Sequence, residues 1–329
     1  MLAVGNLSES YGHRGFYPTP GNPPTTFHAW MFYGAPAQNA AQTYKRYTID
    51  VLRTQYFNLL DDGNLQLVYE DSSDLYNTQN AYSERNIAEL KRFSKEQLVT
   101  ISGHISGMRQ AFSKLSTNST HIIQTLVDFV NDHRLTGIDI DFENYNQWTS
   151  KDYSDYKSFV TSLGKRLHES NKKLAICGPM WTSEEPPFQW KYEDFVNLPI
   201  DYVTPMIYDY QWDYGGGAPI CPLEWLRKWT LKMKRIFHSD QLVIGLPSYG
   251  YTAKRGKYNI RNLTLQQIKR LDGYHGGRRD NSSAEVFKFV GDTVYVSIDR
   301  KAINAKRRVV ESLGVRQISV WHLGGNDWF

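Results

Sequence analysis

The sequence predicts a single α/β domain in the form of a (β/α)8 TIM barrel, with a small β-hairpin inserted after the seventh strand. Strand-like segments alternate eight times with amphipathic helical segments, and this alternation indicates a parallel sheet. The chain has 329 residues, which fits one closed barrel of roughly 250 residues with insertions. Because parallel barrels bury both faces of their strands, the abundant apolar and aromatic residues have a place in this fold.

The first half of the chain supplies the first four strands. Residues 1–24 are rich in Gly, Pro, Ser and Asn, so they are expected to form an extended lead-in to a single barrel domain at 25–329. A helix is expected at Glu84–Phe93, and a second helix is expected to be capped by Ser119 or Thr120. The expected strands are Thr26–Tyr33, Gln55–Leu59, Gln97–Gly103 and Gly137–Glu143.

The second half continues the alternation. A helical stripe at Thr149–Leu167 follows the fourth strand, and Pro222 fits the first position of a later helix. Ala284–Ile298 alternates around Gly291 and is the predicted hairpin. The remaining strands are expected at Lys173–Met180, Asp201–Tyr208, Gln241–Tyr249 and Gln317–Leu323.

Composition excludes several classes of function. The 38 Lys and Arg residues against 34 Asp and Glu residues give a formal net charge of +4, which is too small to indicate nucleic-acid binding. No apolar run approaches the roughly 18 residues of a membrane span. Cys177 and Cys221 form neither a disulfide framework nor a metal cluster, and the sequence leaves their pairing open. No signal-peptide pattern is visible, so localisation stays open.

The segment Gly137–Glu143 carries the strongest chemical signal. Asp139, Asp141 and Glu143 alternate with apolar residues and therefore share one face of a strand. Like charges stacked in this way repel each other, which gains nothing for structure but raises a carboxyl pKa. We therefore expect Glu143 to titrate above its ordinary value of about 4.3.

Two other interpretations of this segment remain. It could be the solvent-exposed face of an edge strand, although its large apolar face favours a buried strand. Carboxylates also bind hard cations, but neither a calcium-type loop nor a pair of His residues at metal spacing accompanies them. We therefore expect no metal at this position.

Aromatic residues collect at the predicted strand ends. In a barrel the functional site lies at the carboxyl ends of the strands. Rings combined with a few acids are typical of a carbohydrate-binding cleft, because sugar C–H groups stack on rings and hydroxyls bond to carboxylates. The strand-end residues are Tyr33, His104, Glu143, Trp181, Tyr208, Asp209, Tyr249 and Trp321.

At these residues the sequence resembles glycoside hydrolase family 18. The family signature Asp-Gly-x-Asp-x-Asp-x-Glu is matched at seven of eight positions, from Gly137 to Glu143, with Thr136 in place of the first Asp. Met206–Asp209, Gly245–Tyr251 and Trp321 are similar to other segments of the family. The branch that contains spore-cortex and peptidoglycan-lytic N-acetylglucosaminidases is the most similar, through Gly137–Asn144, Tyr208–Trp212, Ala218–Trp225 and Trp321–Gly324.

The resemblance implies a retaining mechanism in which the substrate's own acetamido group is the nucleophile. Glu143 would be the general acid and base, Asp141 would orient the acetamido N–H, and Asp139 would tune the charge of Asp141. Tyr208 would bond to the same acetamido group. The remaining residues implied or expected to bind substrate are Trp321, Asp209, Met206, Tyr33, Trp181, Tyr249 and Trp212. No cofactor is implied.

The implied partner is an oligosaccharide or polysaccharide that contains N-acetylglucosamine, which would place the protein outside the cell or at a wall or spore. The sequence does not choose between chitin, peptidoglycan and N-glycan, between endo and exo action, or between oligomeric states. A catalytically silent glycan-binding lectin and a structural protein on the same barrel are the alternative functions.

Overall fold

The computed structural model describes residues 24–34, 49–72, 78–103, 108–271 and 277–329. For residues 108–117 it describes the backbone alone. The expected lead-in, apart from Pro24, and the strand-end residue His104 lie outside these residues.

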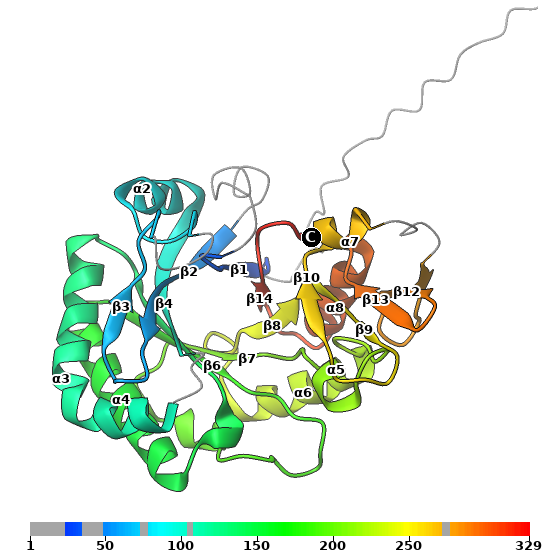
Figure 1. The fold of residues 1–329 in the computed structure, drawn as a ribbon. Helices are drawn as coiled ribbons and strands as arrows, with labels where there is room; N and C mark the ends of the chain where they lie inside the picture. Colours follow the sequence, from blue (N-terminus) through cyan, green and yellow to red (C-terminus); the bar gives the residue numbers. More distant parts are fainter. Residues whose placement is uncertain (1–23, 35–48, 73–77, 104–107, 272–276) are drawn as a thin grey trace, which may run out of the picture.

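Eight parallel strands form the barrel, as the sequence predicts (Figure 1). Hydrogen-bonded neighbours run in the order β7-β6-β5-β4-β2-β1-β14-β8. Isolated parallel bridges from Val203 to Leu242 and from Met206 to Gly245 connect the two ends of this order. The strands are β1 (Thr26–Met31), β2 (Ile49–Leu59), β4 (Ser94–Gly103), β5 (Gly137–Phe142), β6 (Lys173–Gly178), β7 (Tyr202–Pro205), β8 (Ile244–Pro247) and β14 (Gln317–Trp321). A short strand, β3 (Leu65–Leu67), pairs antiparallel with β2.

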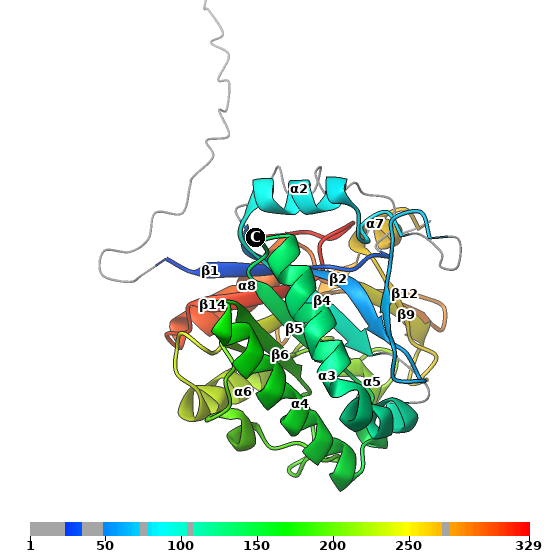
Figure 2. The same ribbon diagram turned by 90° about the vertical axis from the view of Figure 1, so that its left-hand side faces the viewer.

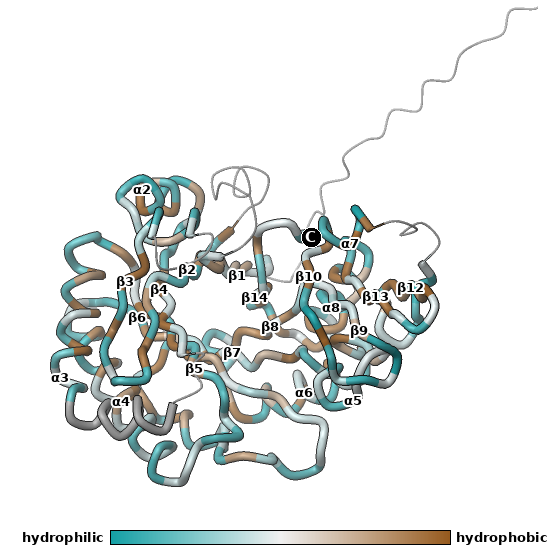
Figure 3. Tube along the Cα trace, in the orientation of Figure 1, coloured by the Kyte–Doolittle hydropathy of each residue, from teal (hydrophilic) through white to brown (hydrophobic). Residues whose placement is uncertain are grey.

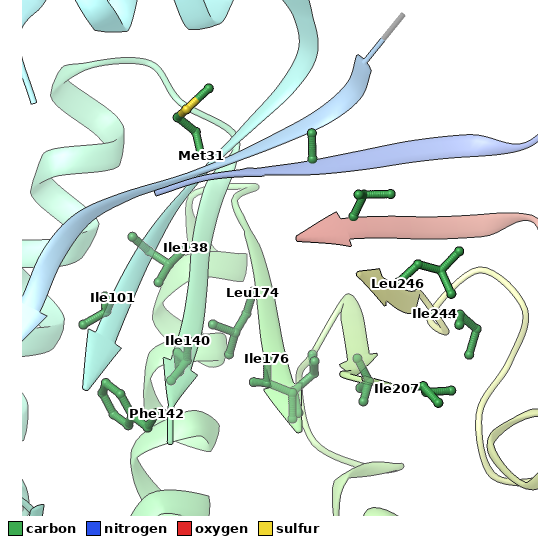
Figure 4. Close-up of a cluster of buried hydrophobic side chains, with 14 of the residues drawn as sticks. Met31, Ile101, Ile138, Ile140, Phe142, Leu174, Ile176, Ile207, Ile244 and Leu246 are labelled. Carbon is green, nitrogen blue, oxygen red and sulfur yellow. The ribbon is translucent and has the colours of Figure 1, made fainter. Parts of the chain in front are cut away.

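The apolar core lies mainly between the strands and the surrounding helices. Figure 2 shows α3 (Met108–Asp132) and α4 (Ser150–Glu169) side by side across β4, β5 and β6. The buried cluster of Figure 4 includes side chains of β5 and its neighbours β4 and β6, together with Met31 on β1 and Ile244 and Leu246 on β8. Phe142, for example, lies 6.1 Å from the ring of Tyr156 and 6.3 Å from that of Phe159, both on α4.

The inside of the barrel is different in character. A small apolar group fills it near the beginnings of the strands, formed by Val51, Leu98, Ala175, Tyr202 and Val243. Farther along the same strand faces, the interior becomes polar and charged, with Arg53 and Asp139 fully buried. Figure 3 shows hydrophobic residues along strands such as β7 and β8, whereas the outer loops are largely hydrophilic.

Local sequence explains where most helices begin. Ser83 caps α2 (Glu84–Phe93), and Thr149 forms a capping box with Asp152 at the start of α4. α6 (Leu223–Ile236) follows Pro222, which is its N-cap residue rather than its first helical residue. α3 begins at Met108, so the expectation of a cap at Ser119 or Thr120 is wrong. Both residues lie inside the helix, which is therefore longer than its apolar stripe indicated.

The predicted hairpin belongs to a larger antiparallel sheet inserted between β8 and α8 (Arg300–Ser312). Its strands β12 (Val286–Val290) and β13 (Thr293–Ser297) turn at Gly291, as expected. The sheet order is β10-β9-β13-β12-β11, with β9 at Gly250–Lys254, β10 at Arg261–Leu263, β11 at Arg278–Arg279 and the short helix α7 (Leu265–Lys269) beside them. In Figure 1 this sheet lies on the opposite side of the barrel from α3 and α4.

Among the residues that the structure describes, no helix is both long enough and apolar enough to cross a membrane.

Candidate active site

Strand β5 places the acidic residues at the carboxyl end of the barrel. A Cβ atom on Gly137 would lie 2.0 Å from the carbonyl oxygen of Lys173 on β6, so only glycine fits where β5 begins. Glu143 directly follows the strand, and its backbone N–H points to the Gly103 oxygen at 3.4 Å. Asn144 then turns the chain with a φ of 60°, so Glu143 is the last side chain before the chain leaves the barrel.

Asp139 lies deeper in the barrel, where three donors surround its carboxyl group. Arg53 Nη1 lies 3.1 Å from Oδ1, Thr100 Oγ1 lies 2.8 Å from Oδ2, and the Cys177 thiol lies 3.8 Å from Oδ1. Both Asp139 and Arg53 are completely buried. Burial raises the pKa of Asp139, whereas Arg53 and the hydrogen bonds oppose this change.

Arg53 connects Asp139 to three more strands. On β6, the Sγ of Cys177 lies 3.9 Å from Arg53 Nη1. Its Nη1 donates to Thr204 Oγ1 at 2.9 Å, and its Nη2 lies 3.1 Å from His28 Nδ1. Burial, together with the charge of Arg53, holds the pKa of His28 well below its ordinary value. His28 is therefore neutral, so Nδ1 accepts from Arg53 and Nε2 donates to Gln317 Oε1 at 3.3 Å.

Sequence reasoning missed both Arg53 and His28. Arg53 lies before Gln55–Leu59, the segment predicted as the second strand, whereas β2 begins at Ile49. The available signal was an arginine two residues after Val51 in the alternating segment that precedes the predicted strand. We expected Asp139 to act with Asp141, but the strand pattern did not indicate a buried cation as its partner.

A second polar group follows β7. Asp209 accepts hydrogen bonds on Oδ1 from the Tyr249 hydroxyl and, at 3.2 Å, from Gln211 Nε2. The Tyr249 ring meets the Trp321 ring edge-on, with centroids 5.1 Å apart, and lies 6.4 Å from the Tyr208 ring. The ends of β7, β8 and β14 therefore bring together four residues that the sequence singled out.

Electrostatic interactions connect this group to the acidic strand. Burial raises the pKa of Glu143 to about 8, and the negative charge of Asp209 adds to the change. Burial is also the main cause that holds the pKa of Tyr208 well above its usual value, with Asp141, Asp209 and Glu143 among the contributing charges. The raised pKa of Glu143 agrees in direction with the sequence prediction. The prediction rested on the acids of its own strand, whereas burial and the charge of Asp209 are the causes in the structure.

The other expected binding residues differ in position. Met206 follows β7, and a Cβ on Gly245 would meet its Cα at 3.2 Å and Tyr208 Cε1 at 3.4 Å. Tyr33 follows β1, with its ring 4.9 Å from Phe32, which in turn lies 6.4 Å from His322. Both residues are half-buried at the carboxyl ends of strands.

The two tryptophans named with them lie in opposite environments. Trp212, on the short helix α5 (Gln211–Tyr214), is 44% exposed and hydrogen-bonds with Asp209. Trp181 is only 5% exposed, because Trp229 packs against it at 4.6 Å and Lys232 lies over its ring. The position of Trp181 favours packing under α6, so the structure does not bring it to an accessible surface.

Cys177 and Cys221 are both buried and free. In the described part of the chain, no group of three or more His, Cys, Asp or Glu residues has the arrangement of a metal site.

A closed parallel barrel that carries a carboxyl group directly after its fourth strand, beside a ring-lined group of polar side chains, has the architecture of a barrel glycoside hydrolase. The model of glycosyl hydrolases family 18 matches residues 28–327, and the chain belongs to this family.

Similar proteins agree with this assignment. The uncharacterized glycosylase YvbX of Bacillus subtilis is 19% identical over 233 residues, which cover 65% of this chain and 66%, slightly under two thirds, of that protein. The crystal structure of a chitinase from Chromobacterium violaceum matches with a TM-score of 0.74 and 18% identity, covering 92% of this chain and 95% of that one. The spore cortex-lytic enzyme SleL of Bacillus cereus matches with a TM-score of 0.74 and 17% identity, over 94% and 73% of the two chains. At these identities the two structures establish the shared fold.

Proposed function

We propose that this protein is a glycosidase that hydrolyses β-1,4-linked glycans containing N-acetylglucosamine. The observation that carries the proposal is the position of Glu143 directly after the fourth strand of the barrel. Burial and the charge of Asp209 raise its pKa to about 8 there, which favours the protonated form at neutral pH. A protonated carboxyl group in that place is suited to protonate a glycosidic oxygen.

The reaction follows the substrate-assisted retaining scheme. Glu143 donates its proton to the glycosidic oxygen as the bond from that oxygen to C1 breaks. The carbonyl oxygen of the substrate's 2-acetamido group forms a bond to C1, giving a positively charged oxazolinium. Water then attacks C1 and transfers a proton to Glu143, which restores the carboxylic acid and the acetamido group.

The neighbouring side chains take supporting roles in this proposal. Asp141 orients the acetamido N–H and stabilises the positive charge on the oxazolinium. Burial keeps the Tyr208 hydroxyl protonated, so it is available as a donor to the acetamido group. Trp321, held edge-on by Tyr249, supplies an apolar face for the sugar ring at the reaction centre.

Peptidoglycan and chitin are the two leading substrates. The segments that resemble the spore-cortex branch favour a bacterial wall or spore glycan, and fold similarity extends to both a cortex-lytic enzyme and a chitinase. Both polymers offer the 2-acetamido group that the scheme requires. Peptidoglycan is therefore the first substrate to test, with chitin oligomers and an N-glycan beside it.

The test is the release of reducing ends from these three glycans by the wild type and by Glu143→Gln. We expect Glu143→Gln to lose at least about a hundredfold in kcat, because general acid–base catalysis contributes roughly 10²–10⁴. Glu169→Gln is the matched control, since Glu169 ends α4 and is 58% exposed in an ion pair with Arg166.

The outcome separates the proposed enzyme from its alternatives. Activity that Glu143→Gln loses and Glu169→Gln retains supports the glycosidase, and the preferred polymer identifies the substrate. Binding of a glycan by both proteins without cleavage by either contradicts the proposal and favours a lectin on the same barrel.

A further inference from the structure

A cation lies inside the barrel where the family motif supplies only acids. Arg53 is 0% exposed and extends from β2 across the barrel interior. Its guanidinium contacts Asp139 on β5, Thr204 on β7 and His28 on β1. It also lies 5.4 Å from the centre of the Trp30 ring. Its Nη1 also lies 3.9 Å from the Cys177 Sγ on β6. One side chain therefore joins the interior faces of five strands.

The ion pair with Arg53 and the hydrogen bonds around Asp139 favour its ionised form, whereas burial opposes it. Arg53 donates to Oδ1, and an arginine side chain is a donor in every state. Thr100 approaches the other oxygen, Oδ2, at 2.8 Å, and the Cys177 thiol approaches Oδ1. The hydroxyl and the thiol can donate or accept, but the guanidinium only donates and is always charged, so the contact with Arg53 stabilises the carboxylate form of Asp139 against the effect of burial.

Asp141 lies one step farther along the same strand face. Thr100 is paired with Asp139 and Ser102 with Asp141, so the Cα atoms of the two acids are separated by about 6–7 Å. At that spacing, the charge of Asp139 acts directly on the ionisation of Asp141 unless another charge cancels it.

We propose that Arg53 is a positioning residue that holds Asp139 as a fixed carboxylate and cancels its charge, so that Asp141 ionises next to a neutral ion pair. The role given to Asp141 rests on the proposed glycosidase activity. The charge pairing of Arg53 with Asp139 rests on the contacts alone.

The groups that face Asp139 support this assignment. His28 is neutral, because burial and Arg53 lower its pKa. Burial raises the pKa of Cys177 well above its ordinary value, so this group is a thiol. Among the described residues that contact Asp139, Arg53 is the cation. The other groups in contact or electrostatic interaction with Asp139, Arg53 or Asp141 include His28 on β1, Thr100 on β4, Tyr145 after β5, Tyr156 on α4, Cys177 on β6, Thr204 on β7 and Tyr208 after β7. The charges of Lys173 and Glu143 act on His28 and Cys177.

The proposal predicts shifts of opposite sign for the two halves of the pair. In Arg53→Gln, the buried carboxyl groups of Asp139 and Asp141 remain without a cation, so they lose their protons at higher pH. The acid limb, which is the fall of kcat/KM on the acidic side of its pH profile, therefore moves to higher pH by about 1–3 pH units. In Asp139→Asn, the uncompensated Arg53 favours the ionised form of Asp141, so the limb moves to lower pH. The double variant removes both charges and returns the limb close to its wild-type position.

The experiment measures kcat/KM against pH for these three variants, with Arg53→Lys and Lys306→Gln as controls. Arg53→Lys keeps the charge and is expected to keep the limb in place, even where the lost fork geometry lowers activity. Lys306 belongs to another completely buried ion pair, 3.0 Å from Glu285. Its variant is expected to lower the Tm without moving the limb. If Arg53→Gln does not fold, Thr100→Val removes one donor from Asp139 and is expected to give a smaller upward shift.

A second readout does not depend on activity. Without Arg53, the folded protein favours a protonated Asp139, so the Tm deficit of Arg53→Gln is small in acid and grows as pH rises through the raised pKa. The deficit of Asp139→Asn is expected to shrink as pH rises, because the ionised Asp141 then compensates part of the charge of Arg53. This pattern in an inactive protein would reject the proposed function and retain the charge pairing.

Three results would overturn the inference. The acid limb could stay in place in Arg53→Gln while activity falls, it could move in the same direction in both single variants, or the two Tm deficits could share one pH dependence. Each would show that Arg53 only supports the fold of the barrel.

Discussion

Glu143 shows how strongly a site residue depends on its surroundings. Its side chain is half-buried, and protein around it removes much of the water that would stabilise a carboxylate. Asp209 is exposed at the end of the barrel but also has a raised pKa, because surrounding protein outweighs the hydrogen bonds from Tyr249, Gln211 and Trp212. The two acids come from β5 and from the segment after β7, so their interaction requires the closed barrel.

A prediction about pH follows from this pair. Because the reaction needs protonated Glu143, we expect kcat/KM to be retained below its pKa and lost as pH rises through about 8. Asp209→Asn removes the like charge and should move this basic limb to lower pH, while burial keeps it above an ordinary carboxyl value. A pH–rate profile of both proteins measures the shift. A wild-type limb near pH 4 to 5, the usual carboxyl range, would contradict the assignment of Glu143 as the acid.

Arg53 marks the limit of prediction at this scale. Strand alternation indicates which side chains share a face, and it placed Asp139 and Asp141 on one face of β5, with Glu143 directly after the strand. The same alternation leaves the partner across the barrel undetermined. That partner depends on the registers from β2 to β4 and from β4 to β5, which place Arg53 opposite Leu98 and Asp139 opposite Thr100.

At the scale of elements, a buried ion pair connects the inserted sheet to the barrel. The Glu285 carboxylate accepts from the backbone N–H groups of Ile220 at 2.7 Å and Cys221 at 2.8 Å. Lys306 on α8 lies 3.0 Å from the same carboxylate and donates to the Ser283 oxygen at 2.6 Å. The loop before α6, the segment before β12 and helix α8 are thereby held at one point.

Removing Lys306 should therefore destabilise the protein. Lys306→Met leaves Glu285 charged, buried and without its cation, and we expect the free energy of unfolding to fall by about 3–5 kcal/mol. Urea denaturation followed by circular dichroism measures this change. Lys301→Met on the same helix replaces an exposed lysine and should change stability by less than about 0.5 kcal/mol. Equal effects of the two substitutions would show that the ion pair has no special role.

The inserted sheet also shows where pattern reading falls short for elements. The β12–β13 hairpin was predictable because it is local, with alternating strands and a glycine at φ 56° in its turn. β9 was not separated from β8, because only Ser248 and Tyr249 lie between them and the apolar pattern continues across the boundary. Its assignment to a second sheet depends on pairing with β13, which begins about forty residues later.

For the whole molecule, the reactivity of the two cysteines reports whether solvent and reagents reach the interior of the barrel and of its inserted sheet. Cys177 lies inside the barrel, and Cys221 lies next to the Glu285 carboxylate. Burial raises the pKa of Cys221 to about 12 and that of Cys177 well above its ordinary value, which leaves both thiols unreactive.

We therefore expect the native protein to show no reaction with a thiol reagent and the denatured protein to show both thiols. The absorbance of the chromophore that the reagent releases gives the number of reactive thiols. It is measured in buffer and in about 6 M guanidinium chloride, which denatures a single domain. A sample reduced before denaturation is the control. Failure to find both thiols without prior reduction would reveal a disulfide, and a thiol that reacts in buffer would show that its surroundings open readily.

The sequence by itself determined the barrel, most of its strands and helices, and the strand that carries the acids. These features are encoded locally, in the period of apolar residues, in capping residues and in glycines such as Gly137, so a single sequence is enough to find them. Tertiary structure decided the rest: the position of Asp209 near Glu143, the burial of Trp181 away from the surface, and the pairing of Arg53 with Asp139. These depend on distances between residues far apart in the chain, and such distances are fixed only when the strands pair in register and the barrel closes.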